Sequence, residues 1–165
     1  MQTIKDSFYV ALRDRLAALD PARVVTVLGV ARPAVIVIEN EIADSAPLWP
    51  QAFYLSWGGC SAATGSERLD PPLLQLACEV TYWTQGSDAL SSQDRGRTLA
   101  QLDTELLTIA APQRTALKDY SLSPVVDLGA NIFWTRPTLN AITQDGNKLA
   151  RTAALHVFAF AEVAQ

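Results

Sequence analysis

The stretch Leu74-Gln75-Leu76-Ala77-Cys78-Glu79-Val80-Thr81-Tyr82-Trp83-Thr84 decides the fold of this chain. The residues at positions 74, 76, 78, 80 and 82 are apolar or aromatic. They alternate with Gln75, Ala77, Glu79, Thr81 and Trp83. Successive side chains of a strand point to opposite faces of a sheet. The period of two therefore predicts a strand over residues 74–84 with one face on a core.

Two segments with a helical spacing of apolar residues lie on either side of this strand. In residues 2–19 the apolar stripe recurs at steps of four and three, and Asp20-Pro21 ends the helix. A second helix is predicted over residues 89–110, after the break at Gly86-Ser87-Asp88 and before Pro112. The two stripes comprise Phe8, Leu12, Leu16 and Leu19, and Leu99, Leu102, Leu106 and Ile109.

Other segments have the composition or the alternation of strands, and Asp145-Gly146 marks a turn before the last of them. These strands are predicted over residues 24–30, 34–39, 52–57, 132–135 and 149–162. Glycine, proline and small polar residues predict loops over 40–51 and 58–72. Residues 113–131 have no pattern that assigns them.

Runs of strands with two segregated helices predict an α+β fold, in which a mostly antiparallel sheet is flanked by helices 2–19 and 89–110. The chain has 165 residues, and 49% of them are hydrophobic. This length and composition allow a self-sufficient core, and we expect a single domain over residues 1–165.

Composition and charge exclude several classes of function. The net charge of −4 argues against specific nucleic-acid recognition, which favours a basic face. The charged N-terminus has no apolar signal core, and the apolar runs at 24–30 and 34–38 are too short for a membrane helix. We therefore expect no membrane association and a cytoplasmic site of synthesis. Cys60 and Cys78 lie in apolar stretches and are expected to be reduced core residues.

No motif for catalysis or cofactor binding is present. The glycines form neither a dinucleotide fingerprint nor a phosphate-binding loop, and Ser56 lies in no nucleophile elbow. His156 is the only histidine, which excludes a site with two histidine ligands and argues against a metalloenzyme. Its apolar neighbours on a predicted strand fit a packed or interface residue better than a base. An enzyme that pairs Cys60 with His156 ranks last among the alternatives, because nothing in their spacing supports it. We predict no enzymatic activity, no cofactor, no metal and no catalytic residue.

Two pairs of acidic residues are weak indications of a functional site. Glu39 and Glu41 are two apart at the end of a predicted strand, where solvated charges are ordinary. Asp103 and Glu105 have the same spacing on a predicted helix and therefore point apart.

The four tryptophans carry more information. They lie at or near strand ends or in loops, where large aromatic side chains cap a core or anchor an interface. A core position is favoured for Trp57 and Trp83, whereas Trp49, between prolines in a loop, fits the core and an interface equally. We take Trp49, Trp57 and Trp134 as candidate interface residues.

The order of elements resembles that of the tail-terminator and neck (head–tail joining) proteins of long-tailed bacteriophages. The resemblance spans nearly the whole chain and rests on layout, because that group has no fixed motif. The segments that carry it are the helix Ile4–Leu19, the strand Val35–Glu39, Val80-Thr81-Tyr82-Trp83-Thr84, the break Gly86-Ser87, the helix with Arg97-Thr98-Leu99-Ala100-Gln101-Leu102, and the last strand Arg151–Phe160.

The resemblance implies a non-enzymatic structural protein that assembles into a ring of identical subunits at the end of a phage tail. Its partners would be further copies of itself and the tail-tube or neck proteins. Its location would be the virion, or the bacterial cytoplasm if a prophage encodes it. Ring closure needs two different complementary faces on each subunit. The alternative is a small ligand- or partner-binding module of a bacterial protein unrelated to phage, which would use the tryptophan-lined loops.

Overall fold

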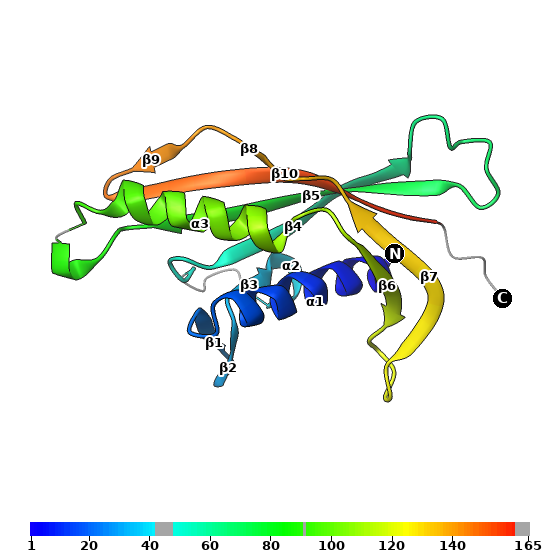
Figure 1. The fold of residues 1–165 in the computed structure, drawn as a ribbon, viewed down its shortest axis with the longest axis horizontal. Coiled ribbons are helices and arrows are strands. Elements are labelled where there is room, and N and C mark those ends of the chain that lie inside the picture. Colours follow the sequence, from blue (N-terminus) through cyan, green and yellow to red (C-terminus); the bar gives the residue numbers. More distant parts are fainter. Residues whose placement is uncertain (42–47, 91, 161–165) are drawn as a thin grey trace.

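A mixed sheet with two long helices on one face forms the body of the molecule (Figure 1). The computed structural model describes residues 1–41, 48–90 and 92–160. The strand order is β3-β4-β5-β10-β7-β6, with β8 and β9 paired to β10. The strands of this sheet are β3 (Val35–Val37), β4 (Phe53–Ala62), β5 (Leu73–Thr84), β6 (Arg114–Asp119), β7 (Val126–Trp134), β8 (Thr138–Leu139), β9 (Thr143–Asp145) and β10 (Lys148–Phe160).

Strands β5 and β10 form the centre of the sheet. They pair antiparallel from Leu149 opposite Thr84 to Phe160 opposite Leu73. All other pairs in this sheet are antiparallel as well, except the short parallel pair of β3 and β4. The predicted α+β fold with a mostly antiparallel sheet is thereby confirmed.

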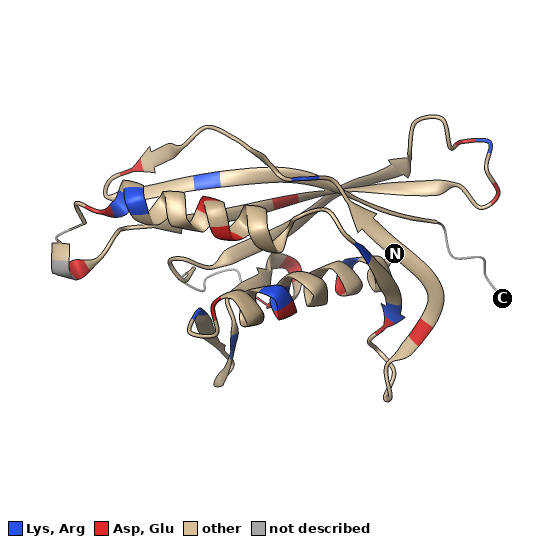
Figure 2. Cartoon of the chain, in the orientation of Figure 1, with Lys and Arg blue, Asp and Glu red and all other residues tan. Residues whose placement is uncertain are grey.

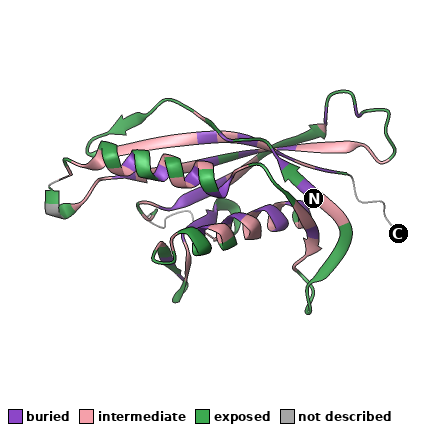
Figure 3. Ribbon diagram, viewed as in Figure 1, coloured by how far each residue is buried: buried purple, intermediate pink, exposed green. Residues whose placement is uncertain are grey.

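Helices α1 (Gln2–Leu19) and α3 (Arg95–Ile109) bury their apolar stripes against the same face of the sheet (Figure 3). From α1 the core receives Ile4, Phe8, Leu12 and Leu16, and from α3 it receives Leu99, Leu102, Leu106 and Ile109. The sheet contributes alternate residues, which include Val80 and Tyr82 of β5 and Leu155 and Val157 of β10. Burial of this apolar surface is the main force that holds helices and sheet together.

The strand predicted over residues 24–30 is wrong as a single element. It is the hairpin of β1 (Val24–Val27) and β2 (Val30–Pro33), a two-stranded sheet separate from the main one. Leu28 and Gly29 turn the chain, with φ angles of 49° and 80°. Positive φ at both central residues is the mark of a type I′ turn, whose twist matches that of the flanking strands. Because β-branched residues lie on both sides of Leu28 and Gly29, the sequence pattern predicted one strand and did not indicate the turn.

Other boundaries also differ from the prediction. Strand β4 continues to Ala62, and the register between β4 and β5 shifts between Trp57 and Cys60, at Gly58-Gly59, as in a β-bulge. The short helix α2 (Ile38–Glu41) replaces the end of the strand predicted over 34–39 and the start of the loop predicted over 40–51.

Helix α3 begins at Arg95 rather than at residue 89, because the 3₁₀ turn η1 (Asp88–Leu90) precedes it. Strands β6 and β7 occupy the unassigned region 113–131 and the strand predicted over 132–135. The last strand agrees with the prediction through Phe160, and its predicted residues 161–162 lie outside the described residues.

Candidate interaction surfaces

Trp134 belongs to the core, which corrects its expected role at an interface. Its side chain is 3% exposed, and its indole Nε1 donates a hydrogen bond of 3.1 Å to the carbonyl of Ala110 at the end of α3. The ring of Phe8 meets it edge-on, with centroids 5.1 Å apart. Strand β7 places Trp134 opposite Val157, on the face that the helices cover. It therefore has almost no surface left for a partner.

Trp57 and Trp49 are half-buried, so each keeps some surface. The ring of Trp57 meets Phe8 edge-on at 5.8 Å, and the ammonium of Lys5 lies 5.5 Å from its centroid. Its indole Nε1 is buried and has no hydrogen-bond partner among the described residues. Trp49 packs against the core, and its carbonyl accepts a bond of 2.8 Å from the hydroxyl of Tyr54. Trp49 and Trp57 remain candidates for an interface.

A hollow of about 480 Å³ lies beside Trp83. The ammonium of Lys148 stands 4.6 Å from the centroid of the indole, within the range of a cation–π interaction. Gln85, Gln144 and Asp145 add polar groups to the lining, and Leu48 adds an apolar one. An aromatic wall with a few convergent polar groups is a common form of a ligand site.

Cys60 and His156 line one small hollow of about 230 Å³, although their spacing in the sequence gave no reason to expect it. Cys60 is exposed rather than in the core, because it lies in the end of β4 where all residues from Gly58 to Ser61 are exposed. Cys78 is buried as expected, and burial raises the pKa of its thiol. The other lining residues are Gly59, Ser61, Gln75 and Ala77, so this hollow has no carboxylate that could orient the imidazole.

The acidic pairs serve the fold. Glu39 accepts a bond of 3.0 Å from the backbone N–H of Trp57, and Glu41 accepts one of 2.7 Å from Val37 and pairs with Arg32 at 2.7 Å. The carboxylate of Asp103 accepts a hydrogen bond of 2.6 Å from the hydroxyl of Tyr82. These carboxylates hold elements together rather than presenting paired oxygens. Within residues 1–41, 48–90 and 92–160, no group of three His, Cys, Asp or Glu side chains is placed to hold a metal ion.

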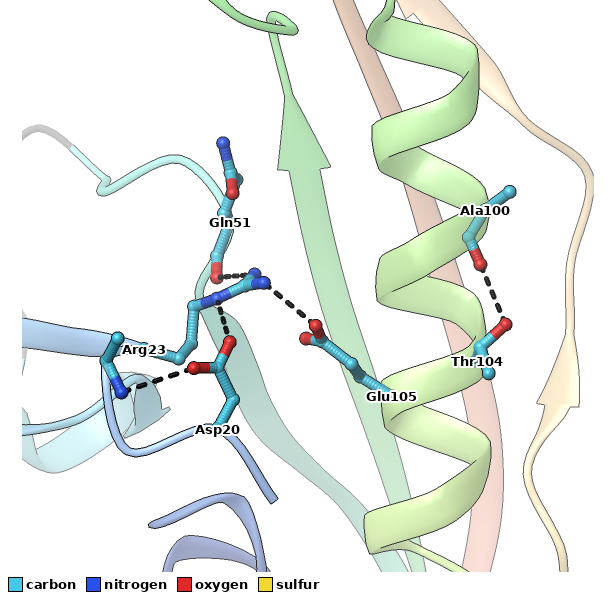
Figure 4. A network of polar contacts seen from close by, with 7 residues as sticks. Asp20, Arg23, Gln51, Ala100, Thr104 and Glu105 are labelled. Carbon is cyan, nitrogen blue, oxygen red and sulfur yellow. Dashed lines mark hydrogen bonds and ion pairs between the residues drawn. The ribbon is translucent and has the colours of Figure 1, made fainter. Parts of the chain in front are cut away.

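Asp103 and Glu105 point apart, as their helical spacing predicts. Glu105 forms an ion pair of 2.8 Å with Arg23 (Figure 4). Arg23 also forms an ion pair of 3.4 Å with Asp20 and donates a hydrogen bond of 3.3 Å to the backbone carbonyl of Gln51. Burial raises the pKa of the Glu105 carboxyl, and the positive charge of Arg23 opposes this rise. The network ties α3 to the end of α1 and to the chain before β4.

Two hairpins at the ends of α1 expose apolar side chains, and the sequence patterns did not single them out. Leu28, at the tip of the β1–β2 hairpin, is 99% exposed. The β6–β7 hairpin exposes Leu122, Val125, Val126 and Leu128, each by 41–50%. The signal that could have located the first was the Leu28-Gly29 pair between two β-branched runs. The second lies in the region without a pattern.

Charge and hydropathy add two findings. Lys and Arg are scattered over helices, hairpins and β10 and gather on no single element (Figure 2). None of the described helices has the length and apolar character required to cross a membrane.

Comparisons with known proteins leave the family open. No protein-family model and no curated protein matches the chain. One solved structure with a similar chain is the virion of a native gene transfer agent (GTA) particle. The alignment covers 96% of this chain and 98% of that one, with 12% sequence identity and a TM-score of 0.41. At this level of likeness, the function has to be argued from the residues themselves.

Proposed function

We propose that this protein is a non-enzymatic structural subunit of a phage-like virion, which assembles with copies of itself into a ring that terminates the tail. The observation that carries the proposal is the set of exposed apolar side chains on two different hairpins at opposite ends of α1. Figure 3 shows the tips of both hairpins as exposed. A ring requires two unlike faces on each subunit, and isolated monomers rarely gain from such projecting apolar side chains. The layout of elements, which resembles that of tail terminators, supports the same assignment.

The polar groups of the molecule support a structural rather than a catalytic role. Glu39, Glu41, Asp103 and Glu105 are engaged in bonds that hold the fold. The hollow with Cys60 and His156 lacks an orienting carboxylate. We expect no hydrolysis of generic ester or phosphate substrates. Activity that disappears in both Cys60→Ala and His156→Ala variants would overturn this part of the proposal.

Self-association is the direct test. Light scattering and sedimentation velocity from micromolar to millimolar concentration should show a rise in mass, and electron microscopy should show closed rings. In phage tails, assembly often waits for the tube end, so tail tubes are included as a template. Trp49→Ala should weaken assembly if this half-buried indole contributes to the contact. A protein that stays monomeric under all these conditions would refute the ring.

The second candidate is a small ligand-binding module, and the hollow beside Trp83 favours it. Its aromatic wall, the ammonium of Lys148 and the nearby amides would suit a small polar molecule. Quenching of tryptophan fluorescence by a panel of such molecules, with Trp83→Phe as control, would support this reading. It would take precedence if binding is saturable and the chain remains monomeric.

A further inference from the structure

We propose that the tip of the β1–β2 hairpin of one copy docks on the β6–β7 hairpin of the next copy, head to tail. This inference rests on the proposed self-assembly and names the two surfaces that perform it. The apolar residues of the β1–β2 tip are Leu28 and Val30. The receiving surface is formed by Leu122, Val125, Val126 and Leu128.

Leu28 breaks two local rules at once. It occupies the first central position of a type I′ turn with φ of 49°, where glycine, asparagine and aspartate are favoured. It is also 99% exposed, so its side chain gains nothing from the fold of its own chain. Residues that violate local preference without a gain in stability are expected at functional sites. An apolar anchor that fills a pocket of a partner explains both departures.

The rest of the β1–β2 hairpin is built to support such an anchor. Val25 and Val27 point inward and are 6% and 7% exposed, which fixes one face of the hairpin to the body. Val30 lies opposite Val27, on the same side of the hairpin, and is 64% exposed next to the turn. Val24, at the base of the hairpin, is 51% exposed on the other side. The exposed apolar side chains next to the turn are therefore those of Leu28 and Val30.

The β6–β7 hairpin is also fixed at its base and apolar at its tip. The hydroxyl of Ser7 accepts a bond of 2.9 Å from the backbone N–H of Lys118 and donates one of 3.3 Å to its carbonyl. These bonds hold the end of β6 beside the N-terminal half of α1. Four exposed apolar residues then occur within residues 122–128. An apolar patch at a rigidly held site fits a protein contact.

A second copy of this chain is the occupant that the geometry and the charges favour. The β1–β2 hairpin follows the C-terminal end of α1, so the two surfaces lie at opposite ends of this helix (Figure 1). Residues 23–33 contain Arg23 and Arg32 and no acid, whereas residues 118–129 contain Asp119 and Asp127 and one base, Lys118, which lies opposite Asp127. Both arginines already have acidic partners, so the attraction is modest, but like-with-like contact would bring equal charges together. Unlike surfaces therefore meet head to tail, and such a contact forms a ring when the rotation between neighbouring copies closes the circle.

Cross-linking tests this pairing. In a Cys60→Ser background, Leu28→Cys and Val126→Cys variants, one of them tagged, are mixed at concentrations where the protein associates and treated with a short bismaleimide. We expect mixed dimers, few dimers of either variant alone, and a ladder of products from the double variant. A Leu90→Cys and Val126→Cys mixture is the control, because Leu90 is 54% exposed outside both hairpins.

A second variant separates docking from folding. Leu28→Asn places a residue that the turn prefers, so the midpoint of thermal unfolding should stay equal or rise. Association should nevertheless weaken by about tenfold or more, since a buried apolar anchor is lost. Leu90→Asn should leave association unchanged. A lower unfolding midpoint with unchanged association would overturn the docking role of Leu28.

The outcomes distinguish this inference from the proposed function. Association without mixed cross-links, or with Leu28→Cys linked to itself, would refute the hairpin pairing and leave the ring intact. Absence of association at millimolar concentration, and of any cross-link, would refute both.

Discussion

Arg23 is the residue on which the polar network between helices depends. Its guanidinium faces the carboxylates of Asp20 and Glu105, and the Arg23 and Glu105 side chains are each 18% exposed. Removal of one partner from a largely buried pair leaves the other charge uncompensated. We therefore expect Arg23→Ala to lower the free energy of unfolding by about 2–3 kcal/mol at neutral pH, as measured by urea denaturation. Arg13→Ala, which breaks an exposed pair with Asp14, is the control and should cost less than about 1 kcal/mol.

The pH dependence of this deficit has a definite sign. Burial raises the pKa of Glu105, and loss of Arg23 removes the charge that opposes this rise. A carboxyl with a raised pKa in the folded state binds its proton more tightly there than in the unfolded chain. Stability is therefore gained as the pH falls toward the folded pKa. The deficit of Arg23→Ala should shrink between about pH 7 and pH 5. A deficit that grows on acidification would contradict this account.

At the scale of elements, Gly86 controls how β5 connects to α3. Its φ is +79°, and a Cβ there would lie 2.5 Å from Oδ1 of Asp94 and 3.0 Å from the backbone nitrogen of Arg95. The same Asp94 oxygen accepts the N–H of Ser87 at 2.8 Å, which closes the turn. Gly86→Ala should therefore cost about 2 kcal/mol or more of unfolding free energy, through strain and displacement of this carboxylate.

Gly96 provides the matched comparison. It lies in the first turn of α3, and an added Cβ meets nothing within 4 Å. Gly96→Ala should be neutral or stabilise the protein by up to about 1 kcal/mol, because alanine favours the helix. Thermal unfolding of both variants gives the readout. Equal effects of the two substitutions would show that backbone conformation at residue 86 has no special role.

Elements that bury one face were predictable, and elements that do not were missed. The alternation at 74–84 and the stripes of α1 and α3 exist because half of each element meets the core. Strand β7 begins with Val126, Asp127, Leu128 and Gly129, all exposed, so no burial pattern was imposed on it. The β1–β2 hairpin was missed for another reason, because the β-branched residues on both sides of its turn have the pattern of a single strand.

The candidate surfaces follow the same division. Trp134 was placed at a strand end correctly, but only the packing of α3 shows that its indole caps the Ala110 carbonyl inside the core. Cys60 was expected in the core, but it lies in the exposed end of β4, and the sequence does not show where the cover of the core ends along that strand. Leu28 became notable only when its φ and its exposure were both known. Long-range packing and turn geometry decide these features, and single-sequence patterns do not encode them.

At the scale of the whole molecule, stability is unevenly distributed. Strands β5 and β10 pair along twelve successive residues between buried neighbours. The β1–β2 hairpin is a two-stranded sheet separate from the main one, and Val24, Leu28 and Val30 in it are exposed to solvent. Two-stranded hairpins have marginal stability on their own, and regions with few buried contacts open most readily. Assembly through these hairpins would therefore stabilise the least stable part of each subunit.

Hydrogen exchange at two protein concentrations tests this coupling of stability to assembly. At low concentration, amides of residues 24–33 and 122–129 should exchange much faster than those of β5 and β10. At high concentration both hairpins should become protected together, because each copy supplies one surface and receives the other. Leu28→Asn should abolish the protection of both, while β5 and β10 stay unchanged. Protection of only one hairpin on association would contradict a head-to-tail contact, since every subunit inside a closed ring buries both surfaces.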